Sequence, residues 1–444
     1  MQNNDLIYAL ATPVGGAIAV IRMSGPECKA ALSRIFTGKV QHRYASFGHI
    51  VYNGETIDEV IAVCFDAPKS YTGEEMAEIS VHGGQATVSR VMEVLSLIGC
   101  RCARGGEFTE RAFLNGKMDL TQAEAVMDIV NASSRRGAKS ALEQLQGKLS
   151  ERIQEIESEL LDALSGIDAA IDYPEELEED VFSMLPSLLK GAYAKTEVLI
   201  KEGLSAKVLR EGAKIAILGV PNAGKSSLLN ALLGTERAIV TSIPGTTRDT
   251  ITEAVSIGGM PVRLIDTAGL RETDDEVEKI GVSLARKAAE NADLILIAID
   301  GSKPLTEAEK RLFDYSDSHE CIAVICKNDI ERIITTEEIK ESFGINAFSV
   351  SSKSGDGIER IKTEITKRIE PENESPVITN IRHIEALLMA KKALKNAVDA
   401  FDILDAECLA TDIRSALSHI GSITGKEIDA EVIDRIFSRF CVGK

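Results

Sequence analysis

Gly219-Val-Pro-Asn-Ala-Gly-Lys-Ser226 is the stretch that decides the fold of the central part of this chain. Its spacing is G-x-x-x-x-G-K-[ST]. The residues before it, Lys214–Leu218, predict a short buried strand, and Ser227–Leu233 predict an apolar helix start. A strand, a glycine loop and a helix in this order form a phosphate cradle, because loop N–H groups and the helix N-terminus point at an anion. The flanking elements argue against the alternative, a glycine-rich turn with Gly-Lys-Ser by coincidence.

The residue types in this loop suit a nucleoside triphosphate. Lys225 would reach the β- and γ-phosphates, and the Ser226 hydroxyl would bind Mg²⁺. Asp266-Thr-Ala-Gly269 ends another predicted strand and is typical of the D-x-x-G segment that contacts Mg²⁺ through water and senses the γ-phosphate. These two segments predict an NTPase without naming the base.

The base is chosen by a later segment, Cys326-Lys-Asn-Asp329, whose Lys327 and Asp329 match the pattern [NT]-K-x-D. A carboxylate can accept both the N1–H and the N2–H₂ of guanine, and adenine offers no such edge. Ser351-Ser-Lys353 matches the S-A-K loop behind the base, with Ser for the usual Ala. Cys326 stands where Asn is usual, so we expect the loss of a bridging amide and weaker guanine affinity.

Switch I is expected at Thr241–Asp249, where Thr247 would offer its hydroxyl to Mg²⁺. Leu270 follows the D-x-x-G segment, at the place where many Ras-like GTPases have a water-orienting glutamine. A leucine cannot orient water. The sequence therefore predicts slow basal hydrolysis that is switched on by another group.

Composition limits the class of protein. The 444 residues suggest about three domains. With 50 basic and 69 acidic residues the net charge is −19, so RNA binding would need local basic patches or a partner. The chain shows no signal-peptide pattern, no membrane-spanning apolar run, and no disulfide or zinc spacing among eight cysteines. We expect a cytoplasmic protein that does not enter a membrane.

The first 117 residues predict a compact α+β domain, with strands at Ala17–Arg22, Ile61–Phe65 and Glu78–Val81 and a helix at Thr87–Leu97. Two polar loops, Pro68–Gly73 and Arg104–Thr109, are candidates for the border of a pocket. Composition alone favours plain turns for both loops.

Helical patterns surround the central segment. Apolar residues recur every three or four positions at Leu149, Ile153, Ile156, Leu160, Leu164, Ile167 and Ile171, which predicts a helix in a bundle core. Pro174 is expected to end this helix, the acidic run Glu175–Asp180 to be solvated, and a second helix to cover Phe182–Leu209. Helical pattern returns from Asn380 onward, after the linker Glu370–Pro376.

Residues 212–370 alternate strand and helix, which predicts a doubly wound parallel sheet. The expected strands are Lys214–Gly219, Val262–Asp266, Leu294–Asp300, Cys321–Lys327 and Phe348–Ser351. Since helical segments flank this region, we expect a multidomain α/β and α+β protein in which a P-loop GTPase domain is inserted into a discontinuous helical domain.

Several segments outside the GTPase region closely resemble the MnmE (TrmE) family of tRNA modification GTPases. They are Gly106–Lys117, Asp119–Ala125, Ile171–Glu176 and the terminal Arg439-Phe-Cys-Val-Gly-Lys444. The family ends in F-C-I-G-K, and Val442 replaces the isoleucine here. The resemblance covers essentially the whole chain.

The resemblance implies a domain plan. Residues 1–117 would bind a folate and mediate dimerisation, 118–211 and 373–444 would form the helical domain, and 212–372 would form the GTPase domain. It also implies a K⁺-activated GTPase that hydrolyses GTP to GDP and phosphate. As a homodimer within a heterotetramer with the flavoprotein MnmG (GidA), such a protein adds a carboxymethylaminomethyl group to C5 of the wobble uridine of certain tRNAs.

The family further implies a 5-formyl-tetrahydrofolate or related one-carbon folate, contacted by Arg22, Glu78, Lys117 and Lys444. Taken alone, Arg22 and Lys444 would be predicted to lie on the surface. The Val14–Gly16 loop near Arg22 is one residue shorter than in the family and lacks its arginine.

By the same resemblance, Asn222, Thr241, Ile243 and Thr246 would hold K⁺, and Glu278 would orient the attacking water. Glu278, Lys225 and Thr247 are then the expected catalytic residues. The residues expected to contact the nucleotide are Asn222, Ala223, Gly224, Lys225, Ser226 and Ser227, then Thr241, Ser242, Ile243, Pro244, Gly245, Thr246 and Thr247, then Asp266, Thr267, Ala268 and Gly269, and finally Lys327, Asp329, Ser351, Ser352 and Lys353.

Three alternatives stay open on sequence alone. An Era- or Der-like ribosome-assembly switch shares the GTPase motifs and lacks the flanking segments. A helical scaffold with a degenerate nucleotide site is suggested by Cys326 and opposed by intact Lys225, Asp266 and Asp329. Cys441 is either a nucleophile or, the favoured interpretation, a small packed residue near the cofactor.

Overall fold

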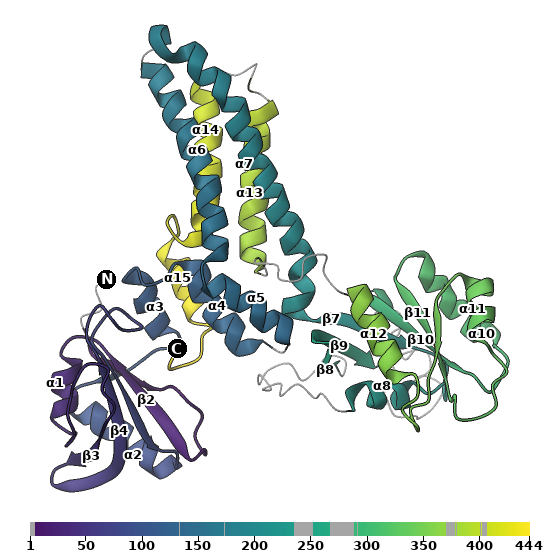
Figure 1. Cartoon of the computed structure of the whole chain (residues 1–444), viewed down its shortest axis with the longest axis horizontal. Coiled ribbons are helices and arrows are strands. Elements are labelled where there is room, and N and C mark those ends of the chain that lie inside the picture. Colours follow the sequence, from purple (N-terminus) through teal and green to yellow (C-terminus); the bar gives the residue numbers. More distant parts are fainter. Residues whose placement is uncertain are drawn as a thin grey trace. The chain divides into compact units, whose positions relative to one another are not determined.

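The computed structural model describes residues 5–132, 134–172, 174–234, 252–266, 288–290, 292–369, 378, 380–399, 401 and 406–444. The chain divides into two compact units, and each is described by itself (Figure 1). The first contains Met1–Met127, Leu145–Leu189 and Asn396–Lys444, and the second contains Asp128–Gln144 and Lys190–Lys395.

The first unit begins with a six-stranded sheet in the order β3-β4-β5-β2-β1-β6. Its strands are β1 (Ile7–Leu10), β2 (Ile18–Ser24), β3 (Ser46–Tyr52), β4 (Glu55–Phe65), β5 (Met76–His82) and β6 (Arg101–Cys102). All neighbouring strands are antiparallel except β1 and β6. The three predicted strands and the predicted helix, α2 (Gln85–Leu97), are confirmed, and α2 packs with α1 (Cys28–Ser33) on one apolar core.

A group of helices follows in the same unit. They include α3 (Glu107–Leu114), α4 (Leu120–Asn131), α6 (Lys148–Asp172), α14 (Ala406–Thr424) and α15 (Ala430–Phe437). Helix α6 lies alongside α14 (Figure 1), and most of its predicted stripe is buried, from Leu149 to Ile167. Leu164 is half-buried, and Ile171 is exposed because it lies at the last turn. The stripe therefore predicted both the helix and the packed face.

Pro174 begins the next helix, α7 (Pro174–Glu211), directly after α6 ends. A proline is compatible with the first turn of a helix because the N–H that it lacks would have no helical partner there. The second helix thus starts earlier than the predicted Phe182 and includes the acidic run in its backbone. Helices α5 (Arg135–Leu145) and α13 (Ile381–Asp399) lie mostly in the second unit.

The second unit is built on a six-stranded sheet in the order β12-β11-β10-β7-β9-β8. The strands are β7 (Ala213–Leu218), β8 (Thr252–Ile257), β9 (Met260–Asp266), β10 (Leu294–Asp300), β11 (Cys321–Cys326) and β12 (Ala347–Ser349). All pairings are parallel except the edge pair of β8 and β9. The predicted doubly wound sheet is confirmed, with an antiparallel edge strand that the sequence did not reveal.

Two apolar cores cover the two faces of this sheet. Alternate residues of β7 show the division, since Ile215 and Ile217 belong to one core and Ala216 and Leu218 to the other. Helices α8 (Lys225–Leu233) and α12 (Ile358–Ile369) complete the first core. The second is covered by the 3₁₀ turn η1 (Arg311–Asp317) and by α11 (Thr336–Phe343), and α10 (Glu307–Lys310) directly precedes η1. Within the described residues, no helix has the length and apolar content that crossing a bilayer requires.

Candidate functional site

The loop between β7 and α8 has the backbone of an anion site. Asn222 and Gly224 both take left-handed conformations, with φ of 62° and 100°. Helix α8 begins at Lys225 with Gly224 as its N-cap, and no side chain caps the first turn. Successive N–H groups in such a turn form a concave nest, and the helix N-terminus adds a partial positive charge. The predicted phosphate cradle is therefore present in the fold.

Two glycines make this loop possible because other parts of the sheet approach it closely. A Cβ at Gly219 would lie 2.6 Å from the Ala298 carbonyl oxygen, and one at Gly224 would lie 3.0 Å from the Cys326 Cβ. Such distances exclude a side chain at Gly219 and strain one at Gly224. The glycines of the motif are thus required by packing as well as by access to a phosphate.

Lys225 folds back over the loop. Its Nζ donates to the carbonyl oxygens of Gly219 at 2.8 Å and Val220 at 2.9 Å. Ser226 and Ser227 are exposed on the first turn of α8. An exposed hydroxyl next to an anion site supplies the oxygen ligand that Mg²⁺ prefers, so the residues present fit this ion.

The segment expected to read guanine lies at the carboxyl end of β11. Lys327 has a positive φ of 65°, and the loop is tied to the next one by hydrogen bonds. The Asn328 N–H donates to the Val350 carbonyl at 3.0 Å, and the buried Ser351 hydroxyl donates to Asp329 Oδ1 at 3.0 Å. The structure thus brings together Lys327, Asp329 and Ser351, with Asp329 exposed at the surface.

The usual amide at position 326 is replaced by a thiol that faces the phosphate loop. The Cys326 Sγ lies 3.3 Å from the position of a Cβ on Gly224. Its hydrogen bond goes to the Val324 carbonyl of its own strand, at 3.7 Å. Burial raises the pKa of this thiol to about 12, so it is protonated. Cys326 fills the space between the two loops without bridging them.

Asp300 is a residue that the sequence analysis did not single out. It ends β10, is paired in register with Cys326, and its Oδ2 accepts a hydrogen bond from Lys327 Nζ at 2.7 Å. Burial raises the pKa of this carboxyl, but hydrogen bonds from Lys327 and Ser302 outweigh it and lower the pKa to about 2. Asp300 could have been found from the sequence, because it lies at the carboxyl end of a predicted parallel strand, where ligands bind in such sheets.

Most of the other expected site residues lie outside the described residues and stay predictions. They are Thr241, Ser242, Ile243, Pro244, Gly245, Thr246, Thr247, Thr267, Ala268, Gly269 and Glu278. Asp266 ends β9, which pairs with β7. The described half of the site therefore comprises the phosphate loop and the base loop.

A second group of expected contacts lies in the first unit, around Arg22 on β2. The Arg22 Nε donates to Glu78 Oε1 at 2.9 Å, and its Nη1 donates to the Gly443 carbonyl at 3.2 Å. Its guanidinium also lies over the rings of Tyr71 and Phe108, at 5.3 and 5.7 Å from their centroids. Arg22 is therefore part of a cluster, and the expectation of a surface residue was wrong.

The carboxyl-terminal segment forms part of this cluster. Gly105 forms an antiparallel bridge with Val442. The N–H groups of Gly106 and Phe108 donate to the carbonyl oxygens of Cys441 and Lys444, at 3.3 and 3.2 Å. Lys444 is thereby placed at the first turn of α3, near the phenylalanine that contacts Arg22. The Cys441 thiol is exposed, so its interpretation as a packed small residue was wrong.

Both polar loops named from the sequence border this cluster. Tyr71 in the first loop bonds to the Thr109 hydroxyl at 2.9 Å, and Lys117 donates to the Pro68 carbonyl at 2.9 Å. The second, Arg104–Thr109, is only partly a loop, since α3 begins at Glu107. Glu107 and Thr109 are fully buried. The preference for plain turns was wrong for this segment.

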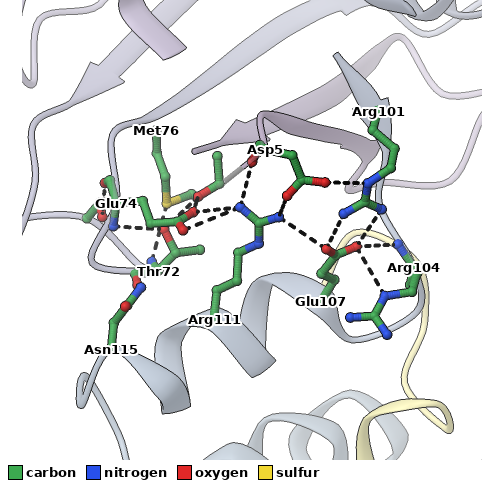
Figure 2. Close-up of polar contacts among 11 residues, drawn as sticks. Asp5, Thr72, Glu74, Met76, Arg101, Arg104, Glu107, Arg111 and Asn115 are labelled. Atoms are coloured by element: carbon green, nitrogen blue, oxygen red, sulfur yellow. Dashed lines mark hydrogen bonds and ion pairs between the residues drawn. The ribbon is translucent and has the colours of Figure 1, made fainter. Parts of the chain in front are cut away.

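Figure 2 shows why α3 is held where it is. Arg111, only 2% exposed, donates to Asp5, Glu74 and Glu107, and Arg101 pairs with Asp5 and Glu107 from the other side. Burial raises the pKa of Glu107, but hydrogen bonds from Arg101, the Arg104 N–H and Arg111 leave it below its usual value. The sequence did not reveal this network, because its members are spread from position 5 to position 111.

Known proteins match the segments of the chain that contain the two groups of residues. Residues 120–441 match the family model described as the MnmE helical domain, and residues 6–117 match the GTP-binding protein TrmE N-terminus. The tRNA modification GTPase MnmE of Geobacillus thermodenitrificans (strain NG80-2) is 41% identical over 464 residues and covers 100% of both chains. The protein of the same name from Listeria welshimeri serovar 6b is 41% identical over 454 residues and covers 99% of both.

Among solved structures, the G domain of the T. maritima FeoB iron transporter is 28% identical. It covers 36% of this chain and 99% of its own, with a TM-score of 0.29. That score is too low to support an argument about the fold.

Proposed function

Since the chain belongs to the MnmE family of tRNA modification GTPases and is a GTP hydrolase, we propose that its GTP cycle drives carboxymethylaminomethyl addition to C5 of the wobble uridine in certain tRNAs. A flavoprotein of the MnmG (GidA) type would be the partner. The observation that carries the proposal is that the family match includes residues 6–117 and the segment up to residue 441. An Era- or Der-like switch would lack these flanking parts, and these matches give it no support.

In the proposed cycle, the described residues bind and orient GTP. The N–H groups of the β7–α8 loop and the Lys225 ammonium hold the β- and γ-phosphates, and Asp329 accepts from guanine. Ser226 and Thr247 are the proposed Mg²⁺ ligands. Bound Mg²⁺ neutralises charge that develops on the phosphate oxygens. Lys225, held by two loop carbonyls, is preorganised for the same task.

Hydrolysis is proposed to depend on K⁺ and on the switch segments. Leu270 cannot orient water, so Glu278 takes that role in the proposal. Asn222, Thr241, Ile243 and Thr246 are the proposed K⁺ ligands. A positive charge beside the β- and γ-phosphates serves where other GTPases use an arginine. The left-handed Asn222 on the rim of the loop supports this assignment.

A one-carbon folate is proposed to bind at the cluster around Arg22. A folate presents carboxylates and a pterin edge, and Arg22, Glu78, Lys117 and Lys444 offer cations and a carboxylate for these. The aromatic ring of Tyr71 beside Arg22 adds a surface for a flat ring. The bound folate would supply the one-carbon unit, while these residues bind and orient it.

The domain plan is also part of the proposal: 1–117 for folate binding and dimerisation, 118–211 with 373–444 for the helical domain, and 212–372 for the GTPase. The family-model match to 6–117 supports the first boundary. A chain of net charge −19 needs a partner to supply affinity for RNA, which supports action within a larger complex. The homodimer is proposed from the family alone. A cytoplasmic location follows from a tRNA substrate.

The decisive experiment is mass spectrometry of wobble nucleosides from cells lacking this protein. The proposal expects loss of the 5-carboxymethylaminomethyl group, restored by the wild-type gene and not by a Lys225→Ala variant. Unchanged wobble nucleosides in the deletion strain would overturn the proposed substrate while leaving the GTPase assignment intact.

A further inference from the structure

The base loop begins with a residue that cannot anchor it. Cys326 is buried, its sulfur bonds within its own strand, and its side chain lies where a Cβ on Gly224 would crowd it. A thiol is a weak donor and a weak acceptor, so it provides no strong bond across the two loops. Another group must fix Lys327, whose left-handed backbone is unfavourable for a residue with a side chain.

Asp300 is placed to supply that anchor. The parallel register pairs Asp300 with Cys326, so its side chain leaves the sheet at the level where the base loop starts. Its side chain is 8% exposed, whereas that of Lys327 is 38% exposed. A charge-assisted bond of 2.7 Å from a rigid buried acceptor to a half-exposed lysine restricts the lysine more than the aspartate.

The two carboxylate oxygens of Asp300 have separate tasks. Oδ1 accepts from the Ser302 N–H at 3.1 Å and from the Ser302 hydroxyl at 2.6 Å, which closes the turn after β10. Oδ2 accepts from Lys327. The bonds to Ser302 therefore fix the orientation of the carboxylate. Oδ2 is then held in place to accept from Lys327 at the start of the base loop.

We propose that Asp300 is a positioning residue for guanine recognition: by holding Lys327, it keeps the loop of Lys327 to Asp329 in the conformation that reads the base, in place of the amide absent at Cys326. This inference rests on the proposed base-reading role of Asp329. The loop's other tethers, from Asn328 and Asp329 to residues 350–356, fix its far end. Asp300 fixes the near end.

Because the two oxygens of Asp300 bond to different residues, the two bonds can be removed separately by a matched pair of variants. Asp300→Asn keeps an oxygen for Ser302 and replaces the other with an amide that cannot accept from Lys327. Ser302→Ala removes the hydroxyl bond of the turn and leaves Oδ2 in place. Two quantities are measured: the affinity for GDP, and the ratio of this affinity to the affinity for inosine diphosphate. Inosine diphosphate lacks the 2-amino group from which Asp329 would accept a hydrogen bond. General destabilisation would weaken both nucleotides equally, so the ratio isolates base reading.

For the full-length protein titrated with fluorescent GDP and with unlabelled inosine diphosphate as competitor, Asp300→Asn should weaken GDP about tenfold, the value of one charge-assisted hydrogen bond. The ratio of the two affinities should fall toward one, while Ser302→Ala keeps both within about twofold. In a Lys327→Met background, Asp300→Asn should have less than a twofold further effect. Should Asp300→Asn not fold, Asp300→Ala removes the acceptor of Lys327 without burying a new donor. Because it also removes the acceptor of Ser302, its effect is compared with that of Ser302→Ala.

An unchanged GDP affinity and ratio in Asp300→Asn would overturn the inference, as would an equal effect with and without Lys327. Asp329→Asn distinguishes a failure of the base-reading role of Asp329 from a failure of the positioning role of Asp300. If it leaves the ratio unchanged, the base-reading role itself fails. If it lowers the ratio and Asp300→Asn does not, only the positioning role of Asp300 fails.

Discussion

Replacing Arg111 by methionine should open helix α3 of the amino-terminal unit. Methionine keeps much of the apolar stem of arginine and removes the guanidinium that bonds to Asp5, Glu74 and Glu107. Glu107 is fully buried. Removing one partner of a buried ion pair costs about 3–5 kcal/mol, because the other charge stays buried without compensation.

The lower end of that range applies here. Glu107 keeps Arg101, whose side chain is 42% exposed, and the Arg104 N–H at 2.8 Å. A loss of about 3 kcal/mol raises the opening equilibrium about 10²-fold, at 1.4 kcal/mol for each factor of ten. Hydrogen exchange followed by mass spectrometry should show this rise in a peptide covering Glu107–Leu114.

A second arginine of the same sheet-and-helix region gives the control. Arg90 pairs with Glu55 and Glu93, and all three side chains are at least 38% exposed. Such surface pairs are worth about 0–1 kcal/mol, so Arg90→Met should change exchange in α3 by less than about fivefold. A rise below tenfold in Arg111→Met, or one equal to that in Arg90→Met, would refute the reasoning.

The same network predicts a dependence on pH. Glu107 and Asp5 both have lowered pKa values, the latter first through its hydrogen bond from Arg101. A carboxyl whose pKa is lowered by folding stabilises the fold fully above its usual pKa, near 4.5 for Glu107, and loses this contribution as the pH falls through the lowered value. Protection of α3 in the wild type should therefore decline in acid, and Arg111→Met should flatten that decline.

Four further outcomes are expected. Replacing Na⁺ by K⁺ at equal ionic strength should raise the rate of GTP hydrolysis strongly, and equal rates in the two salts would reject K⁺ activation. Asp329→Asn should shift the preference from GTP to xanthosine triphosphate; a variant that still prefers GTP would remove the base-reading assignment. Deleting Lys444 should weaken formyl-tetrahydrofolate binding and leave GTP binding intact, and an unchanged folate titration would contradict the assignment. Gly224→Ala should lose most nucleotide affinity, because its Cβ would crowd Cys326, whereas Gly259→Ala, with open space around it, should cost only about 1–2 kcal/mol of stability from its positive φ of 80°.

The central sheet could be predicted almost completely from the sequence. Strand β10 matches its predicted bounds, and β7 and β11 each end one residue earlier than expected. Apolar runs of β-branched residues between glycine and polar segments fix such strands locally. The phosphate and base loops follow from them, because the carboxyl ends of parallel strands meet at one edge of the sheet.

The cluster around Arg22 could not be predicted in the same way. Its second acceptor, the Gly443 carbonyl, lies 421 positions away along the chain. No periodicity or local motif connects residues at that separation, and only the resemblance to a family brought Arg22 and Lys444 into one site. The buried Glu107 was missed for a different reason. Its partners Arg101, Arg104 and Arg111 lie within six positions of it, but no local sequence pattern marks a carboxylate as buried.

The antiparallel bridge between Gly105 and Val442 has a consequence for biosynthesis. The ion pair of Arg22 and Glu78 joins neighbouring strands and can form as soon as the first sheet leaves the ribosome. The carbonyl of Gly443 is translated 421 positions after Arg22, which takes roughly 20–80 s at about 5–20 residues per second. Until residues 441–444 are made, the N–H groups of Gly106 and Phe108 lack the carbonyl partners that they have in the folded chain.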